Sequence, residues 1–284
     1  MLLFNKLTLK IHCWGGLGSQ LLALNYYLGV QEKFPGRRVF LVLHTGGITA
    51  RNSEIDFLSN KINIIKVDDY RSTPNKGRIL SSSPLSKLSL LKFFANLFRI
   101  VITEDANVSQ VKLWTSSVRC TYTKNVLRKK NAIKLAQILE INLDDLQKNF
   151  LGVHYRLGDL PALKPGSLVS IQSISSILTE LLKTYTKVRK IKVFSDTNLN
   201  DPSLQLSNLI DTEWRSVDTL QTIRELTQAK CFVGTNSKVS IWIAIFRWAL
   251  DIPGDVYLPT SIISQFIELT NNDRTKSVTI KTYS

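Results

Sequence analysis

The chain has 284 residues, of which 44% are hydrophobic and 21% charged, a composition ordinary for a folded protein of one large or two small domains. The formal net charge of +15 indicates an anionic partner: nucleic acid, a membrane surface or a nucleotide diphosphate. Three widely spaced cysteines, Cys13, Cys120 and Cys231, form no CxxC pair, which argues against a disulfide framework or a zinc site. The three cysteines fit a reducing, cytoplasmic compartment. Cys13 and Cys231 border apolar runs that resemble strands, which predicts buried thiols at these two positions.

The N-terminal third predicts a βαβ unit and therefore a parallel sheet. We expect a first strand over residues 7–13, a Gly-rich turn over 15–20, a helix over 21–33 and a strand over 39–43. The first eleven residues lack the continuous apolar core and cleavage site of a signal peptide. No uncharged apolar run reaches the ~18 residues of a membrane span.

The middle of the chain is less regular. Residues 71–87 are rich in Ser, Pro, Lys and Asn and predict a loop. An apolar helix with Lys92 and Arg99 is expected over residues 88–102, and residues 120–149 are expected to be largely helical. The helix over 88–102 is best interpreted as a core helix, with peripheral contact at the inner face of the membrane as the alternative.

A second α/β series begins near residue 150. Its expected strands cover residues 150–155, 191–194 and 231–234, and its expected helices lie near 170–188, 218–228 and 238–250. Two α/β halves, residues 1–148 and 149–284, are the simplest interpretation.

The turn between the first strand and helix carries the residues Gly15, Gly16, Gly18 and Gln20. Glycines at a helix N-terminus leave backbone N–H groups facing a ligand, where the helix dipole favours anions. The spacing is not that of the dinucleotide-binding GxGxxG motif. An ordinary tight turn is the alternative interpretation.

The strand near residue 150 ends in His154-Tyr155-Arg156-Leu157-Gly158-Asp159. Ligands of α/β proteins bind outside the carboxyl ends of strands, and the planar donors of Arg156 suit a phosphate. A structural ion pair of Arg156 with Asp159, and a buried core role for His154, are the alternatives.

Two further strands end in polar residues. Ser195 and Asp196 follow one strand, and Asp196 can accept hydrogen bonds from guanine or cap a helix. Asn236, Ser237 and Ser240 follow the other strand and can hold a diphosphate, although a plain helix cap is favoured for this motif alone. The sequence contains no DxD triplet, so a bound metal is not indicated.

Taken in order, these four motifs resemble those of the inverting α-1,2-fucosyltransferases of glycosyltransferase family 11, bacterial surface-polysaccharide enzymes among them. The family motifs are Gly-Gly-Leu-Gly-Asn-Gln, His-x-Arg-Arg-Gly-Asp, Phe-Ser-Asp-Asp and Asn-Ser-Ser-Phe-Ser-Trp-Trp. Their counterparts here begin at Gly15, His154, Phe194 and Asn236. The resemblance covers roughly residues 7–250.

The resemblance implies a GT-B-like pair of Rossmann-type halves with a donor cleft between them, the N-terminal half on the acceptor side and the C-terminal half on the donor side. It implies transfer of fucose from GDP-fucose to a hydroxyl of a glycan or lipid-linked glycan, without a cofactor or metal. Arg156 would contact the diphosphate, Asp196 would read guanine, and Ser237 and Ser240 would hold phosphate. His154, Asp159 and another acidic residue are all candidates for the general base.

Six positions depart from the family's pattern. Ser19 replaces Asn, Leu157 replaces the second Arg, and Thr197 replaces the second Asp. The other three, Lys238, Val239 and Ile241, lie in the last motif. The departures leave two alternatives, a transferase for another GDP-sugar and a non-catalytic nucleotide-sugar-binding protein. A nucleic-acid-binding protein is a third alternative, and only the net charge supports it. The basic residues are dispersed along the chain and no nucleic-acid-binding motif is present, which argues against this class.

Overall fold

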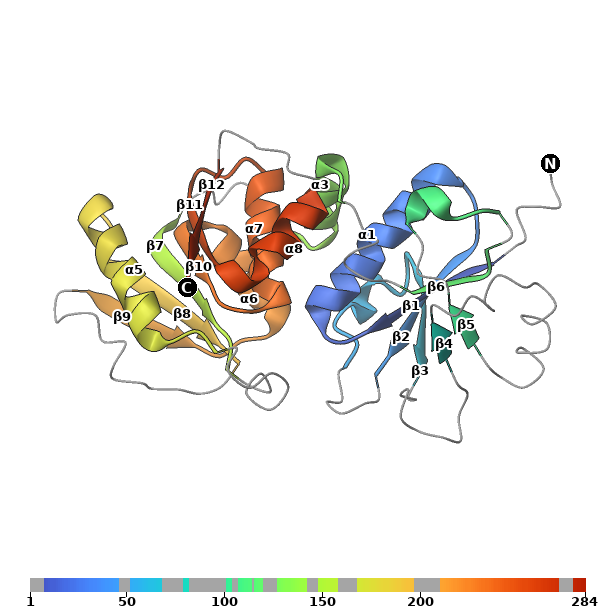
Figure 1. The fold of residues 1–284 in the computed structure, drawn as a ribbon, viewed down its shortest axis with the longest axis horizontal. Helices are drawn as coiled ribbons and strands as arrows, with labels where there is room; N and C mark the ends of the chain where they lie inside the picture. The colour runs from blue at the N-terminus through green and yellow to red at the C-terminus, as the bar shows by residue number, and fades with distance from the viewer. Residues whose placement is uncertain are drawn as a thin grey trace. The chain divides into compact units, whose positions relative to one another are not determined.

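A computed structural model describes residues 8–45, 52–67, 79–81, 101–103, 107–113, 115–119, 127–141, 148–157, 168–196, 210–270 and 278–284. The chain divides into two compact units, Met1–Leu127 and Arg128–Ser284 (Figure 1). This boundary lies earlier than residues 148/149, because helix α3 (Lys129–Ile138) packs against helix α7 (Lys238–Ala249) of the second unit.

The N-terminal unit contains a parallel sheet in the order β3-β2-β1-β6. Its strands are β1 (Leu9–Trp14), β2 (Val39–His44), β3 (Asn63–Val67) and β6 (Ser117–Arg119). A separate parallel pair consists of β4 (Ile79–Ser81) and β5 (Val101–Thr103). The short 3₁₀ helices η2 (Asp56–Leu58) and η4 (Val108–Gln110) lie in the connections.

Helix α1 (Leu17–Lys33) packs against β1 and β2 and is buried on most sides, as an apolar helix without a polar face must be. It ends before Pro35 and Gly36, and Gly36 has a φ of +78° that favours glycine. The Lys33 ammonium binds the backbone oxygens of Val108 and Ser109, which ties the end of α1 to η4.

The C-terminal unit contains a six-stranded parallel sheet in the order β12-β11-β10-β7-β8-β9. In chain order the strands are β7 (Lys148–Tyr155), β8 (Lys190–Ser195), β9 (Asp211–Arg215), β10 (Ala229–Gly234), β11 (Gly254–Pro259) and β12 (Val278–Tyr283).

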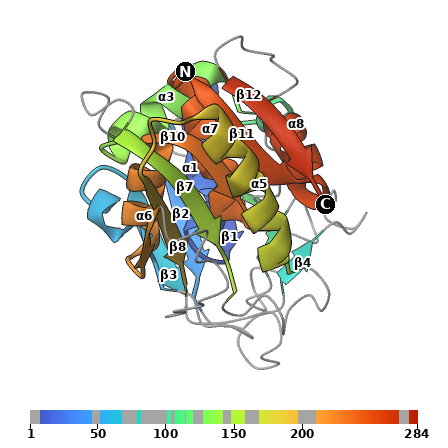
Figure 2. The ribbon, with the colours of Figure 1, turned by 90° about the vertical axis from the view of Figure 1, so that its left-hand side faces the viewer.

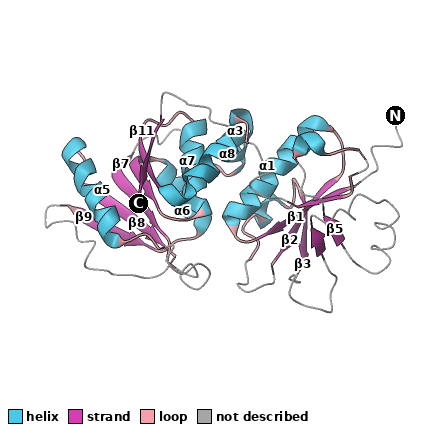
Figure 3. Cartoon of the chain, in the orientation of Figure 1, coloured by secondary structure: helices cyan, strands magenta, loops and turns pink. Residues whose placement is uncertain are grey.

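Helices cover both faces of this sheet (Figures 2 and 3). Helix α5 (Ile171–Thr184) packs its apolar stripe against one face, where Leu151, Val153 and Ile191 belong to the same core. Helices α6 (Thr219–Thr227), α7 and α8 (Thr260–Thr270) contact β7 and β10 to β12 and lie on the other side of the sheet from α5. Alternate residues of β7 therefore face different helices.

One buried cation fixes the α7 side of the sheet. The guanidinium of Arg247 binds the backbone oxygens of Thr227, Ala229 and Pro253. Burial lowers the pKa of Arg247 to about 10, so the side chain stays charged at neutral pH. Its donors satisfy backbone oxygens where α6 ends and β10 begins.

Most elements expected from the sequence are confirmed, with differences at their ends. Helix α1 begins at Leu17 rather than residue 21, so Gly18, Ser19 and Gln20 belong to its first turn. The helix expected over 88–102 is wrong at its end, because residues 101–103 form β5, and residues 88–100 lie outside the described part. The helix expected over 120–149 is shorter, since α3 ends at Ile138 and β7 starts at Lys148.

Buried thiols were expected at Cys13 and Cys231, and both are buried. Cys120 lies outside the described residues. Within the part of the chain that the structure describes, we find no helix with the length and hydropathy to cross a membrane.

Candidate functional site

The order of strands in the C-terminal unit identifies one edge of the sheet as the place for a ligand. The chain proceeds from β7 outward to β8 and β9, then returns to β10 on the opposite side of β7. Ligands of open parallel sheets bind outside the carboxyl ends of the strands at such a reversal. His154 near the end of β7 is the register partner of Gly234 at the end of β10. Residues 154–157 of the first motif, the part that the structure describes, therefore meet residues 234–240 at this edge.

A closed set of hydrogen bonds joins the two strand ends to helix α7. His154 Nδ1 lies 2.8 Å from Ser240 Oγ, and that hydroxyl accepts a bond from the Thr235 N–H at 3.1 Å. The Thr235 hydroxyl donates to the His154 backbone oxygen at 2.8 Å. These three residues, which we call the His154–Thr235–Ser240 network, are all buried. They fix β7, β10 and α7 relative to one another.

The network also sets the position of Arg156, because the Arg156 N–H donates to Thr235 Oγ1 at 3.0 Å. On its other side lies Asp196 at the end of β8. The Arg156 Nε is 3.9 Å from Asp196 Oδ2, and the Leu157 N–H donates to Asp196 Oδ1 at 2.9 Å. The Arg156 side chain is 23% exposed, so its guanidinium is held by the protein and still reaches the surface.

His154 is buried in this network, being 7% exposed. Burial lowers the pKa of its imidazole to about 4; the nearby Asp196 carboxylate opposes the shift and the Arg156 guanidinium adds to it. The ring is therefore neutral at neutral pH, and its Nδ1 faces Ser240 rather than the surface.

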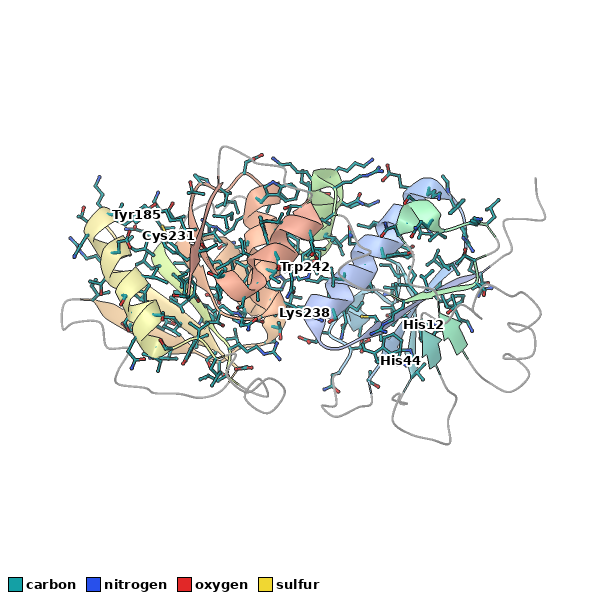
Figure 4. The ribbon with its side chains drawn as sticks, viewed as in Figure 1. His12, His44, Tyr185, Cys231, Lys238 and Trp242 are labelled. Atoms are coloured by element: carbon teal, nitrogen blue, oxygen red, sulfur yellow. The ribbon has the colours of Figure 1, made fainter. Side chains whose placement is uncertain are left out.

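The N-terminus of helix α7 lies beside Arg156 in the same edge. Ser237 caps the helix, and its hydroxyl accepts a hydrogen bond from the Val239 N–H at 3.2 Å. Ser240 is fully buried and Ser237 nearly so, so the structure uses both hydroxyls internally. Asn236 is half-buried and Lys238 is exposed. Figure 4 shows Lys238 at the start of α7, one turn before the buried Trp242.

Gly234 allows the close packing that this edge requires. A Cβ on Gly234 would lie 2.7 Å from the Ser240 Cβ and 3.0 Å from a methyl of Leu258. Only glycine leaves room for α7 to start so close to β10.

The Gly-rich turn lies in the N-terminal unit. Gly15 has a φ of +104°, which favours glycine, and Gly16 is the N-cap of α1. The Leu17 N–H donates to a carboxylate oxygen of Glu54 at 2.8 Å, so a side chain of the protein occupies this helix N-terminus. The buried Gln20 amide donates to the backbone oxygens of Gly15 and Asn52 and accepts from the Glu54 N–H.

The structure therefore brings five of the expected site residues together at one edge of the sheet. Ser195, which is buried at the end of β8, lies beside them. The five are His154, Arg156, Asp196, Ser237 and Ser240. Gly15, Gly16, Gly18 and Gln20 form a second group around the start of α1. Asp159 lies outside the described residues.

Sequence reasoning missed Thr235 and Lys238. Thr235 directly follows a predicted strand, which is the signal that identifies Arg156 and Asp196 as well. Lys238 appeared only as a departure from a family motif.

Comparisons with known proteins bear on the fold. No protein-family model and no curated protein matches the sequence. Among solved structures, the chain resembles a glycosyl transferase family 9 protein from Veillonella parvula, with a TM-score of 0.51, 8% identity, and coverage of 99% of this chain and 88% of that one.

Two further structures are similar at lower scores. POFUT1 in its apo form has a TM-score of 0.48 at 11% identity, covering 89% of this chain and 98% of that chain. The E. coli heptosyltransferase WaaC with ADP has a TM-score of 0.48 at 11% identity, covering 98% and 93%. With its two parallel-sheet α/β units, the chain has a GT-B-like fold, the fold of the family 9 glycosyltransferase.

Proposed function

We propose that the protein is an inverting glycosyltransferase that moves a sugar, fucose in the first instance, from a GDP-sugar to a glycan hydroxyl. The observation that carries the proposal is the placement of Arg156. Its backbone is bound to Thr235, its side chain lies beside Asp196, and it occupies the strand-order reversal next to the start of α7. A fold alone does not identify a function, so the argument depends on this site.

The chemistry of sugar transfer uses such a site. The acceptor oxygen bonds to the anomeric carbon of the donor, the bond from that carbon to the phosphate oxygen breaks, and GDP leaves with the bonding electrons. Negative charge therefore develops on the diphosphate. The fixed Arg156 guanidinium, the positive end of α7 and the exposed Lys238 would stabilise that charge.

The acceptor hydroxyl must lose a proton during displacement. We propose that His154 is a positioning residue rather than the base, because it is buried and its Nδ1 faces Ser240. Asp159 and another acidic residue stay the candidates for the base.

Reading of guanine by Asp196 and independence of metal also stay predictions. Four further statements stay predictions: donor binding by the Gly-rich turn, a lipid-linked acceptor, contact with a membrane, and a cytoplasmic location.

A second candidate is a different GDP-sugar, and Leu157 favours it. The resembled family has a second arginine at this position, whereas the Leu157 side chain packs against the hydrophobic core beneath α5. The first charged side chain after β10 is that of Lys238 at the start of α7. Strand β10 borders β7 on the side opposite β8, which carries Asp196 at its end. A changed distribution of charge around the donor sugar would change which sugar is accepted.

Thermal unfolding with GDP, GDP-fucose, GDP-mannose, UDP-glucose and ADP tests the proposal. A ligand that binds only the folded protein raises the unfolding midpoint. We expect the guanine nucleotides alone to raise it, and Arg156→Ala to weaken their binding about 10- to 100-fold, because a charge-assisted hydrogen bond contributes about 1.5–3 kcal/mol.

The matched control is Arg189→Ala, an exposed arginine near the amino end of β8, which should leave nucleotide binding unchanged. Equal stabilisation by ADP would contradict guanine specificity. No stabilisation by any nucleotide would refute the proposed function. Turnover of a GDP-sugar separates a transferase from a non-catalytic binding protein.

A further inference from the structure

The N-terminal sheet has a reversal of strand order of its own. The chain proceeds from β1 to β2 and β3 on one side and then to β6 on the other side of β1. The same rule that located the first site therefore points to the carboxyl ends of β1 and β6. Trp14 ends β1 and Arg119 ends β6.

A stack of planar side chains occupies this edge. The Trp14 indole lies 4.3 Å from the His44 imidazole with an angle of 9° between the rings. The Arg119 guanidinium lies 5.6 Å from the Trp14 ring. Because His44 comes from β2 and Arg119 from β6, the two flank β1 from opposite sides. A guanidinium stacked on an aromatic ring still presents donors at its edge.

A pair of imidazoles adjoins the stack. His12 Nδ1 lies 2.9 Å from His44 Nε2, and Figure 4 shows the two side chains next to one another. His12 is 3% exposed, and its Nε2 has no hydrogen-bond partner among the residues that the structure describes. A buried polar atom without a partner destabilises the folded protein, and a hydrogen bond to a ligand hydroxyl would relieve this cost.

The surroundings of the pair are positive. Burial, with smaller contributions from the neighbouring His44 and Lys10, lowers the pKa of His12 to about 3. The His12 ring is therefore neutral at neutral pH and offers a hydrogen bond, while the charge comes from Lys10 and Arg119. These two side chains and His12 lie on the same face of the sheet.

We propose that the His12–His44–Trp14–Arg119 cluster binds the acceptor sugar, and that this sugar carries an oxyanion, a carboxylate or a phosphate. The oxyanion would lie against Arg119, and a ring hydroxyl would bind His12 Nε2. The inference rests on the proposed function, because transfer requires a second substrate that supplies a hydroxyl.

The experiment uses the fact that the chain contains only three histidines. In the full chain labelled with ¹⁵N-histidine, ring signals of His12 and His44 report on this cluster and those of His154 on the donor site. We titrate glucuronate, glucose 6-phosphate, glucose and GDP separately. At least one acidic sugar should shift the His12 and His44 signals saturably, about tenfold more tightly than glucose, which corresponds to about 1.4 kcal/mol. GDP should shift only His154.

Arg119→Gln should weaken the binding of the acidic sugar about tenfold and leave GDP binding unchanged. The matched control is Arg38→Gln, an exposed arginine outside the cluster that precedes β2 in the same unit. If neither acidic sugar moves the His12 and His44 signals, or if Arg119→Gln binds as tightly as the parent, the inference fails. If the sugars bind but GDP leaves His154 unmoved, the proposed donor site fails and this cluster stands.

Discussion

Both units place a strand, a short turn and a helix at the strand-order reversal of a parallel sheet, but they satisfy the helix N-terminus differently. In the N-terminal unit the N-cap is Gly16, and the Glu54 carboxylate binds the Leu17 N–H from a distant part of the chain. In the C-terminal unit Ser237 caps α7 itself, while Arg156 is fixed beside it. A Gly-rich turn thus need not leave its N–H groups for a ligand, whereas a serine-capped helix can still adjoin a cationic site.

The largest expected effect concerns the buried imidazole of the C-terminal site. Its native pKa of about 4 lies below the ordinary value of 6.5, so between these pH values the unfolded chain binds more protons than the native one. The contribution to stability is therefore complete above pH 6.5 and falls as the pH drops towards 4. We expect a loss of about 3 kcal/mol from this group, which His154→Asn abolishes.

Urea unfolding of the full chain at several pH values, followed by circular dichroism, measures this effect. Ser176→Ala, which changes an exposed and non-titrating serine on α5, is the control and should keep the pH dependence of the parent. If His154→Asn retains all the pH dependence of the parent, His154 is not buried in its neutral form.

A smaller effect is expected when the serine at the centre of the network is removed. Ser240→Ala leaves His154 Nδ1 without its partner, whereas the Thr235 N–H keeps its second bond, to the His154 backbone oxygen at 3.1 Å. We expect a loss of about 2 kcal/mol in the free energy of unfolding, because one unsatisfied buried group costs about 1–3 kcal/mol. Nucleotide binding should weaken as well, since Arg156 loses its alignment.

Urea unfolding and nucleotide titration of Ser240→Ala are compared with Ser176→Ala, an exposed serine on α5. A Ser240→Ala variant with the parent's stability and affinity would show that the network does not position Arg156.

The smallest expected effect belongs to the N-terminal turn. Glu54→Gln keeps an acceptor for the Leu17 N–H but removes the charge from the helix N-terminus, at a cost of about 0.5–1 kcal/mol. GDP binding should not change, because the proposed diphosphate site lies beside Arg156 in the C-terminal unit and not at the N-terminus of α1. Tighter GDP binding by Glu54→Gln, measured by titration calorimetry, would place the diphosphate at the Gly-rich turn and reverse the comparison.

The sequence predicts the alternation of strands and helices well, because apolar runs such as residues 150–155 and 231–234 are bounded by polar or glycine residues. It also identifies His154, Arg156 and Asp196, since each lies at the end of a strand. Several elements have no counterpart among those expected, namely strands β3, β4, β6, β9, β11 and β12 and helix α8. In the edge strands β9 and β12 the reason is that apolar residues alternate with polar and charged ones, so a continuous apolar run is lacking.

The partners of the site residues could not be predicted. Ser240 has the hydroxyl of a phosphate ligand, yet it is buried against His154. Gln20 has the amide of a donor-binding residue, yet it binds backbone around Glu54. In each case the local sequence gives the residue type, and only the tertiary structure shows which groups it contacts.

The closed form of the His154–Thr235–Ser240 network has a consequence for the history of such sequences. Because each member holds the other two, the cost of a second substitution depends on whether the first has occurred. A lineage that loses one member relaxes the constraint on the rest, so the three residues are expected to be retained together or exchanged together. The exposed Lys238 lies outside the three residues of this network, so its substitution leaves the hydrogen bonds among them in place, and donor preference can change there while the position of Arg156 is kept.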